Sequence, residues 1–266
     1  AKWPMAEPEP GRWEYYDEAV TAAEASGLRV LGMLDGAPQW TSTKPRTEGY
    51  WNFYSIPDKP DALEKWKTYV RNVTGHYRGR IDDWEIWNEP WGNWWLAAGG
   101  TPKLYADFMS AAFQTAHAAN PQARILGVDT YGSSEDNWTR PVLALSGTRS
   151  FDGFSFHDYS DELFGGPLNP ALRDGRRLVD LQKAVGEPKP LWVTEGGLFN
   201  PGSLYAPQTG GLSPRLQLAW AVRFDVSYLA AGCKVFFIYS LHTDPPMGEL
   251  NTMCTEHDRA IRPMLA

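Results

Sequence analysis

The stretch IDDWEIWNEP, residues 81–90, decides the fold of this chain. Its first seven residues predict a buried strand that is rich in aromatic and β-branched side chains, and Pro90 ends regular structure. Five more runs of this kind follow along the chain, at residues 28–34, 123–128, 151–157, 190–194 and 233–239. Several are almost continuously apolar, which is typical of parallel strands covered on both faces.

Helical patterns separate these strands. The sequence predicts helices in five segments, at residues 14–26, 61–77, 101–119, 171–185 and 213–231. Apolar residues recur at helical spacing in the second, and cap residues mark an end of the first, third and fifth. Strand alternating with helix predicts an α/β fold with a parallel sheet, in which sites lie at the carboxyl ends of the strands. Long loops follow those ends and no linker interrupts the chain, so we expect one domain over residues 1–266.

The composition argues against several classes of partner. The chain has 266 residues, a formal net charge of −7 and no run of five basic residues, which argues against nucleic acid and anionic membranes. No apolar run approaches the roughly 18 residues that a membrane helix needs. The 13 Trp, 12 Tyr and 11 Phe either pack in a core or stack on the flat C–H face of a sugar.

Two glutamates follow predicted strands directly. Glu89 comes after the strand quoted above, and Glu195 ends the strand within WVTEGG, residues 192–197. A carboxylate at such a place is costly to bury unless it is hydrogen-bonded or functional. Hydrolysis of a glycosidic bond uses two carboxyl groups that flank the bond. Either glutamate alone could form an ion pair or a cap, but the two together favour glycoside hydrolysis.

These motifs resemble those of the retaining glycoside hydrolases of clan A, which are built on a (β/α)8 TIM barrel. In that clan an Asn-Glu pair ends strand 4 and a second glutamate ends strand 7, as in WEIWNEP and WVTEGG here. LGMLDGAPQW at 31–40, FSFHDY at 154–159 and VFFIYS at 235–240 look like strands 3, 6 and 8. The pattern is most similar to glycoside hydrolase family 39, with families 5 and 51 close to it.

The resemblance implies roles for particular residues. Glu89 would be the acid/base, Glu195 the nucleophile, and Asn88 a hydrogen-bond partner of the sugar 2-hydroxyl. Tyr159 or His157 would hold Glu195 or the acid/base by a hydrogen bond. The implied activity is hydrolysis of β-glycosidic bonds in oligo- or polysaccharides by double displacement. Xylosides and arabinosides are the first expectation, and no cofactor is implied.

Only strands 3 to 8 of the clan's barrel have a clear counterpart in the chain. The opening residues 1–19 look like the tail of strand 2 with its loop and helix. A barrel opened there exposes two strand edges, so we expect a truncated chain, or closure by another segment or by a second subunit in a homo-oligomer. A sugar-binding relic or an inactive barrel is therefore the alternative to an enzyme. The chain shows no signal peptide, and both a secreted and a cytoplasmic location stay open.

Aromatic and acidic residues in the loops after the strands are further candidates for sugar contact. Each could instead pack or cap its own loop: Asp35, Trp40, Trp91, Trp94, Trp95, Tyr131 and Tyr239. Trp66, Trp84 and Trp220 are expected in the core.

A metal-dependent hydrolase is a weaker third alternative. The residues that suggest it lack the spacing of a metal site: His157, Asp158, His242, Asp244 and His257. Cys233 and Cys254 are expected to be free thiols, because the strand that starts at Cys233 carries the chain away from it.

Overall fold

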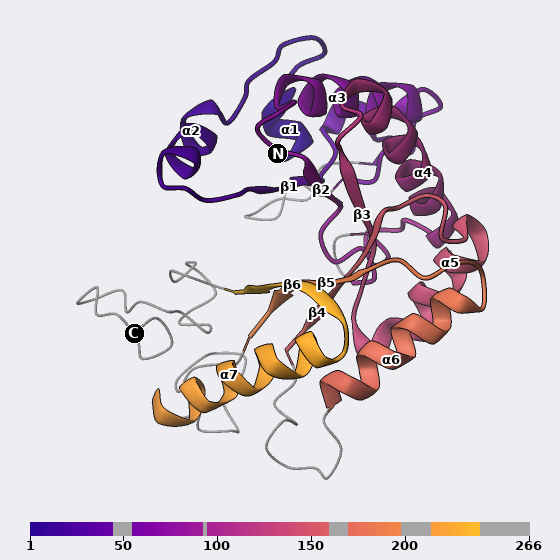
Figure 1. Cartoon of the computed structure of the whole chain (residues 1–266). Helices are drawn as coiled ribbons and strands as arrows, with labels where there is room; N and C mark the ends of the chain where they lie inside the picture. The colour runs from indigo at the N-terminus through magenta and orange to yellow at the C-terminus, as the bar shows by residue number, and fades with distance from the viewer. Residues whose placement is uncertain (45–54, 93–94, 160–169, 198–213, 240–266) are drawn as a thin grey trace. The chain divides into compact units, whose positions relative to one another are not determined.

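A computed structural model describes residues 1–44, 55–92, 95–159, 170–197 and 214–239 of the chain (Figure 1). The chain forms two compact units. The first comprises Ala1–Ser155 with Leu181–Lys189, and the second comprises Phe156–Asp180 with Pro190–Ala266. Six strands follow one another in the sheet in the order β1-β2-β3-β4-β5-β6, which is also their order along the chain. All six correspond to strands predicted from the sequence.

The first unit is built on three parallel strands, β1 (Leu31–Leu34), β2 (Asp83–Ile86) and β3 (Arg124–Thr130). β1 pairs with β2, and β2 pairs with β3. Gly32 is needed in β1 because a Cβ atom there would come within 2.3 Å of the Trp84 ring on the neighbouring strand. Because the three strands are parallel, their carboxyl ends lie at the same end of the sheet.

Three helices precede or connect these strands. α2 (Asp17–Ala25) precedes β1, α3 (Ala62–His76) joins β1 to β2, and α4 (Pro102–Ala119) joins β2 to β3. α3 and α4 lie side by side in Figure 1. The Trp66 indole N–H of α3 donates to the Phe108 carbonyl of α4 at 3.0 Å. The sequence predicts all three helices to within a few residues at each end.

Two short helices escape prediction, α1 (Trp3–Ala6) and α5 (Arg140–Ser146). They have 4 and 7 residues, too few for a periodic apolar pattern to appear in the sequence. α1 follows a parallel bridge between Lys2 and Asp35 at the end of β1. The opening residues thus add to β1 as expected for the tail of a neighbouring strand. A cavity of about 410 Å³, lined mainly by apolar residues of α2 and β1, lies beside this edge.

Aromatic side chains dominate the core of the first unit. Trp3, Trp66, Trp87 and Trp95 are fully buried, and successive ring centroids in this series lie 5.5, 6.2 and 4.7 Å apart. Trp84 is buried as well. The predicted core positions of Trp66 and Trp84 are therefore confirmed.

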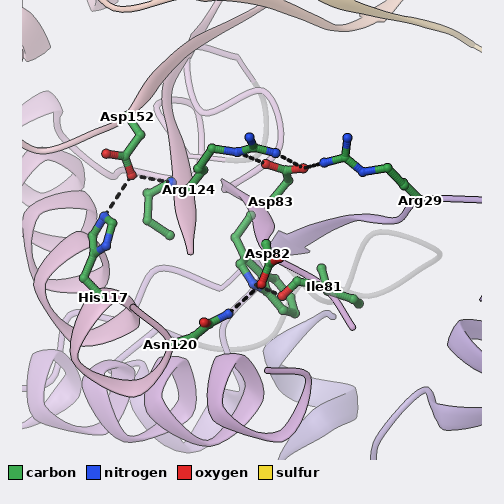
Figure 2. Close-up of polar contacts among 10 residues, drawn as sticks. Arg29, Ile81, Asp82, Asp83, His117, Asn120, Arg124 and Asp152 are labelled. Carbon is green, nitrogen blue, oxygen red and sulfur yellow. Dashed lines mark hydrogen bonds and ion pairs between the residues drawn. The ribbon is translucent and has the colours of Figure 1, made fainter. Parts of the chain in front are cut away.

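Ion pairs connect the amino ends of the strands in the first unit, as Figure 2 shows. Asp83, at the start of β2, has only 7% of its side chain exposed. It pairs with Arg124 of β3 at 2.5 Å and with Arg29, which precedes β1, at 3.0 Å. Asp152 contacts His117 of α4 at 2.9 Å. These contacts lie at the end of the strands opposite to the predicted site, so they bear on stability.

The second unit contains β4 (Gly153–Asp158), which starts at the end of the first unit, with β5 (Leu191–Gly196) and β6 (Cys233–Ile238). β5 and β6 pair in parallel. α6 (Pro170–Lys183) precedes β5, and α7 (Pro214–Ala230) leads into β6 and lies beside it in Figure 1. None of the helices in the described residues is both long enough and apolar enough to span a membrane.

Cys233 begins β6 with a buried thiol. Burial raises the pKa of this thiol to about 12, and the nearby charge of Asp158 adds to the effect. Cys233 is a free cysteine, as predicted. Cys254 and the side chain of Trp220 lie outside the part of the chain that the structure describes.

Candidate active site

Glu89 follows β2 in a strained stretch of backbone. Trp87 has a φ of 67° and Glu89 a φ of 44°. Such left-handed values are uncommon outside glycine and persist only where the surrounding structure fixes them. Trp87 is fixed because its ring is buried and its N–H donates to the Leu34 carbonyl at 2.9 Å. The turn leaves Asn88 and Glu89 half-buried at the carboxyl end of β2.

Asp129 lies next to this turn, near the end of β3. Its side chain is 0% exposed, and its Oδ2 accepts a hydrogen bond from the Glu89 N–H at 2.5 Å. The backbone here is also left-handed, with a φ of 77° at Val128 and 37° at Asp129. The Val128 carbonyl accepts a hydrogen bond from the buried Trp138 indole at 2.8 Å. The backbone is thus left-handed at the ends of both β2 and β3, and the buried Asp129 carboxylate joins the two ends.

Tyr105 of α4 reports the electrostatic character of this region. Its hydroxyl donates to the Ile86 carbonyl at 2.9 Å. Burial raises the pKa of Tyr105 well above its ordinary value, and the negative charges of Asp129 and Glu85 raise it further. Glu85 itself is buried on β2. Two buried carboxyl groups, those of Asp129 and Glu85, thus lie close to the Glu89 turn.

Two of the predicted sugar-contact residues come together above these strands. Trp91 follows the Glu89 turn and Tyr131 follows β3, and both are half-buried. Their rings are stacked, with centroids 5.3 Å apart and planes at 23°. A partly exposed aromatic pair at the carboxyl ends of two strands is suited to stack on a sugar ring. Trp94, also predicted for this role, lies outside the described residues.

Trp95 is a correction to the sequence prediction. It is fully buried, and its indole N–H donates to the Thr101 carbonyl at 2.9 Å. Its ring packs edge-on against Trp87 and Tyr105. Because the ring is enclosed by protein, Trp95 fixes the loop to the core and does not contact a ligand.

The end of β1 carries Asp35, which is fully buried. Lys2 Nζ lies 2.7 Å from its Oδ2, and one third of the Lys2 side chain is exposed. Trp40, nearby in a short helical turn (Gln39–Thr41), is half-buried and packs edge-on against Trp3. Trp40 stays a predicted sugar contact. Asp35 is a second correction, because its enclosed carboxylate pairs with Lys2 and leaves the Lys2 ammonium as the accessible group there.

Glu195 lies near the end of β5 in the second unit, with 21% of its side chain exposed. The Tyr159 hydroxyl donates a hydrogen bond to Glu195 Oε1. His157 Nδ1 lies 3.9 Å from Glu195 Oε2, and its ring is buried. Of the two residues expected to hold a glutamate, Tyr159 makes the hydrogen bond and His157 lies beside the other oxygen.

Gly196 brings the ends of three strands close together. A Cβ atom at this position would lie 2.5 Å from the Asp158 carbonyl oxygen of β4, so only glycine fits. The Tyr239 N–H, just after β6, donates to the Gly196 carbonyl at 2.8 Å. The Asp158 carboxylate accepts a hydrogen bond from the Tyr228 hydroxyl. Tyr239 is half-buried and stays a predicted sugar contact at the same strand ends as Glu195.

Asp129 and Lys2 are the residues that sequence reasoning missed. Asp129 directly follows an apolar run, as Glu195 does, and that pattern was a usable signal. Lys2 gave no signal, because its pairing with Asp35 depends on the fold. His242, Asp244 and His257, considered for a metal, lie outside the described residues, so the metal alternative stays a prediction.

Strands in chain order with helices between them, and a glutamate at the carboxyl end of β2 and of β5, define the class of the clan A TIM-barrel glycoside hydrolases. The sequence model of glycosyl hydrolase family 10 matches residues 1–145, more than half of the chain. The chain belongs to this family. It is 29% identical over 137 residues to "Endo-1,4-beta-xylanase 1" of Humicola insolens. The matched segment covers 47% of this chain and 28% of that enzyme.

Solved structures confirm the fold. A family 39 glycoside hydrolase from Bacteroides cellulosilyticus WH2 gives a TM-score of 0.72 at 17% identity, over 98% of this chain and 54% of that one. A family 10 structure from Paenibacillus barcinonensis gives 0.67 at 17% identity, over 98% of this chain and 82% of that one. The predicted α/β class, a TIM barrel of which six strands are present, is therefore correct. The chain spans about half the length of the family 39 structure and less than a third of the xylanase.

The predicted clan is confirmed, whereas the family that matches by sequence is family 10. Families 39, 5 and 51 were the expectation, and both family 39 and family 10 appear among the similar folds. The resemblance rested on an Asn-Glu pair and a second strand-end glutamate, which are features of the clan and do not separate its families. The match that decides the family covers residues 1–145 and therefore excludes the Glu195 motif.

Proposed function

We propose that this chain carries the site of a retaining endo-β-1,4-xylanase, with Glu89 as acid/base and Glu195 as nucleophile. The observation that carries the proposal is the placement of these glutamates in a family 10 chain. Each lies at the carboxyl end of a strand, the end at which TIM-barrel enzymes have their active sites. The resemblance to a xylanase of Humicola insolens supports xylan as the substrate.

In the first step the Glu195 carboxylate attacks the anomeric carbon of the sugar. The Glu89 carboxylic acid gives its proton to the leaving oxygen, the glycosidic bond breaks, and a glycosyl ester of Glu195 forms. The Tyr159 hydroxyl already donates to Oε1 of Glu195, so it orients the carboxylate and leaves the second oxygen for the attack. The partial exposure of Glu195 gives a substrate access to it.

In the second step water replaces the leaving group. Glu89, now a carboxylate, takes a proton from water while the water oxygen attacks the anomeric carbon. The ester bond breaks, which returns Glu195 to the carboxylate and Glu89 to the acid. Two inversions at one carbon retain the β configuration of the product.

Asn88 and the Trp91–Tyr131 pair would hold the sugar chain. Asn88 is half-buried beside Glu89 and would bond the 2-hydroxyl, a contact that strengthens in the transition state. The stacked rings of Trp91 and Tyr131 offer an apolar, partly exposed surface to the sugar. These contacts suit an uncharged polysaccharide, because they bind through hydroxyl groups and C–H faces.

Hydrolysis of xylan, xylo-oligosaccharides and aryl β-xylosides by the chain tests the proposal. We expect turnover with retention of the β anomer, followed by proton NMR of the first product. The rate of the Glu195→Gln variant should fall to background, because the amide is not a nucleophile. Glu89→Gln should lose about 10²- to 10⁴-fold, the contribution of a general acid. Glu18→Gln, at an exposed position of α2, is the matched control and should leave the rate unchanged.

An inverted product, or full activity in Glu195→Gln, contradicts the double-displacement assignment. A folded chain that binds xylo-oligosaccharides with no turnover instead supports the sugar-binding alternative. Isothermal titration with xylohexaose separates that case from a chain that does not bind at all.

A further inference from the structure

We propose that Asp129 is a positioning residue for Glu89. Its buried carboxylate holds the Glu89 N–H and so fixes the left-handed backbone from which the Glu89 side chain acts. The proposal rests on the proposed role of Glu89 as acid/base. Asp129 is 0% exposed, so it acts through Glu89 and does not touch the sugar.

The hydrogen bond itself is the first argument. Asp129 Oδ2 lies 2.5 Å from the Glu89 nitrogen and accepts a hydrogen bond from its N–H. Burial of Asp129 keeps water from competing for its carboxylate.

The end of the β2–β3 ladder is the second argument. Backbone pairing between these strands runs from Asp83 with Arg124 to Glu85 with Leu126. Glu89 lies beyond the last pair. The Asp129 side chain therefore supplies the connection between β2 and β3 at the point where the backbone ladder has ended.

The paired strain is the third argument. The φ of Glu89 is 44° and that of Asp129 is 37°, and a buried left-handed residue lies just before each of them, Trp87 two positions before Glu89 and Val128 directly before Asp129. Backbone of this kind relaxes unless the structure holds it. Since Glu89 is only half-buried, packing alone holds it less firmly than the core residues, and the bond from Asp129 supplies the missing restraint.

The readout that distinguishes positioning from stability is the dependence of rate on the leaving group. A poor leaving group needs a proton from Glu89, whereas dinitrophenolate departs without one. A misplaced acid therefore slows aryl xylosides with basic leaving groups and spares activated ones. A general loss of folded protein slows all substrates by the same factor.

We would measure kcat/KM for aryl β-xylosides, from phenyl to dinitrophenyl, with the whole chain and its Asp129→Ala and Asp129→Asn variants. Asp129→Ala should lose about 10- to 100-fold on phenyl xyloside and less than about threefold on the dinitrophenyl substrate. Asp129→Asn keeps an acceptor oxygen without the charge, so its loss should be smaller with the same trend. Glu89→Gln should show the same trend more strongly.

Trp138→Phe is the matched structural control. It removes the hydrogen bond to the Val128 carbonyl and leaves the contact between Asp129 and Glu89 in place. Its effect should be equal across the substrates. An equal loss across all substrates in both Asp129 variants overturns the proposal, and if Asp129→Ala does not fold, Asp129→Asn decides it.

The amide proton of Glu89 gives a readout that needs no activity. A strong bond to a carboxylate places this resonance far downfield and slows its exchange with solvent. In Asp129→Asn it should move upfield and exchange faster, and an unchanged resonance overturns the proposal. If the wild-type chain has no xylanase activity, the proposed function fails, and this resonance alone decides whether Asp129 holds Glu89.

Discussion

Trp91 and Trp95 lie four positions apart in one loop and have opposite surroundings. Trp91 is half-buried and stacks on Tyr131, whereas Trp95 is enclosed by Trp87 and Tyr105. Sequence reasoning placed both at the site, because composition and spacing do not show how a loop folds back onto the core. The hydrogen bond from the Trp95 indole N–H to the Thr101 carbonyl holds the ring in this place.

Substitution by alanine should separate the two tryptophans. Trp95→Ala removes a fully buried indole, so we expect a loss of about 3–5 kcal/mol in the free energy of unfolding. Trp91→Ala should cost less than about 1 kcal/mol of stability and raise KM for xylo-oligosaccharides about two- to tenfold, the equivalent of one stacking contact. Urea unfolding and steady-state kinetics measure these effects. Equal stability losses in the two variants would contradict the assignment.

At the residue scale the sequence was most informative about the two glutamates that directly follow predicted strands. Glu89 and Glu195 were predicted at the ends of strands, and the structure places both there. Asp129 carries the same pattern but was assigned only to a loop. Its contact with the Glu89 N–H crosses from one strand to the next, and such a contact depends on register, which the sequence does not specify.

At the scale of elements, alternation of strand and helix was enough to predict the six strands and the long helices. The apolar periodicity of α3 placed Trp66, Tyr69 and Val73 on its buried face, as observed. The short helices α1 and α5 were missed because they are shorter than the period that prediction needs. The ion pairs of Figure 2 were missed as well, because they join residues far apart in the sequence.

Those ion pairs predict an unequal effect of two arginines. Arg124 makes two bonds to the nearly buried Asp83, at 2.5 and 2.8 Å, and is 48% exposed. Arg29 makes one bond and is 80% exposed. Arg124→Met should therefore cost about 1.5–3 kcal/mol of stability, and Arg29→Met less than about 1 kcal/mol.

Chemical denaturation of both variants at low and high salt checks this order. Added salt should reduce the stability loss of Arg29→Met more than that of Arg124→Met. The reason is that salt screens the more exposed ion pair of Arg29 more strongly. The reverse order of the two losses would show that Asp83 depends mainly on Arg29.

At the scale of the whole molecule, several buried acids share one pH dependence. Burial raises the pKa of Tyr77 and of Cys233 to about 12, and that of Tyr69, Tyr105 and Tyr228 well above its ordinary value. In the unfolded chain these groups ionise near their ordinary values, about 10 for tyrosine and about 8.5 for cysteine. The folded state thus binds more protons than the unfolded state in this range.

These groups should therefore make the chain lose stability as pH rises from about 9 to about 12. Urea unfolding across these pH values measures the loss, and tyrosinate absorbance should rise together with unfolding. Tyrosines that ionise at constant stability would contradict the burial seen here.

The first unit also has an optical property that follows from its core. Trp3, Trp66, Trp87 and Trp95 form a connected series with ring centroids 4.7 to 6.2 Å apart. At such separations excitation passes between indoles before it is emitted, so these four act as one chromophore. Their emission comes from whichever ring has the lowest excited state. The emission of these four rings therefore reports on the core of the first unit, whichever of the four absorbs the light.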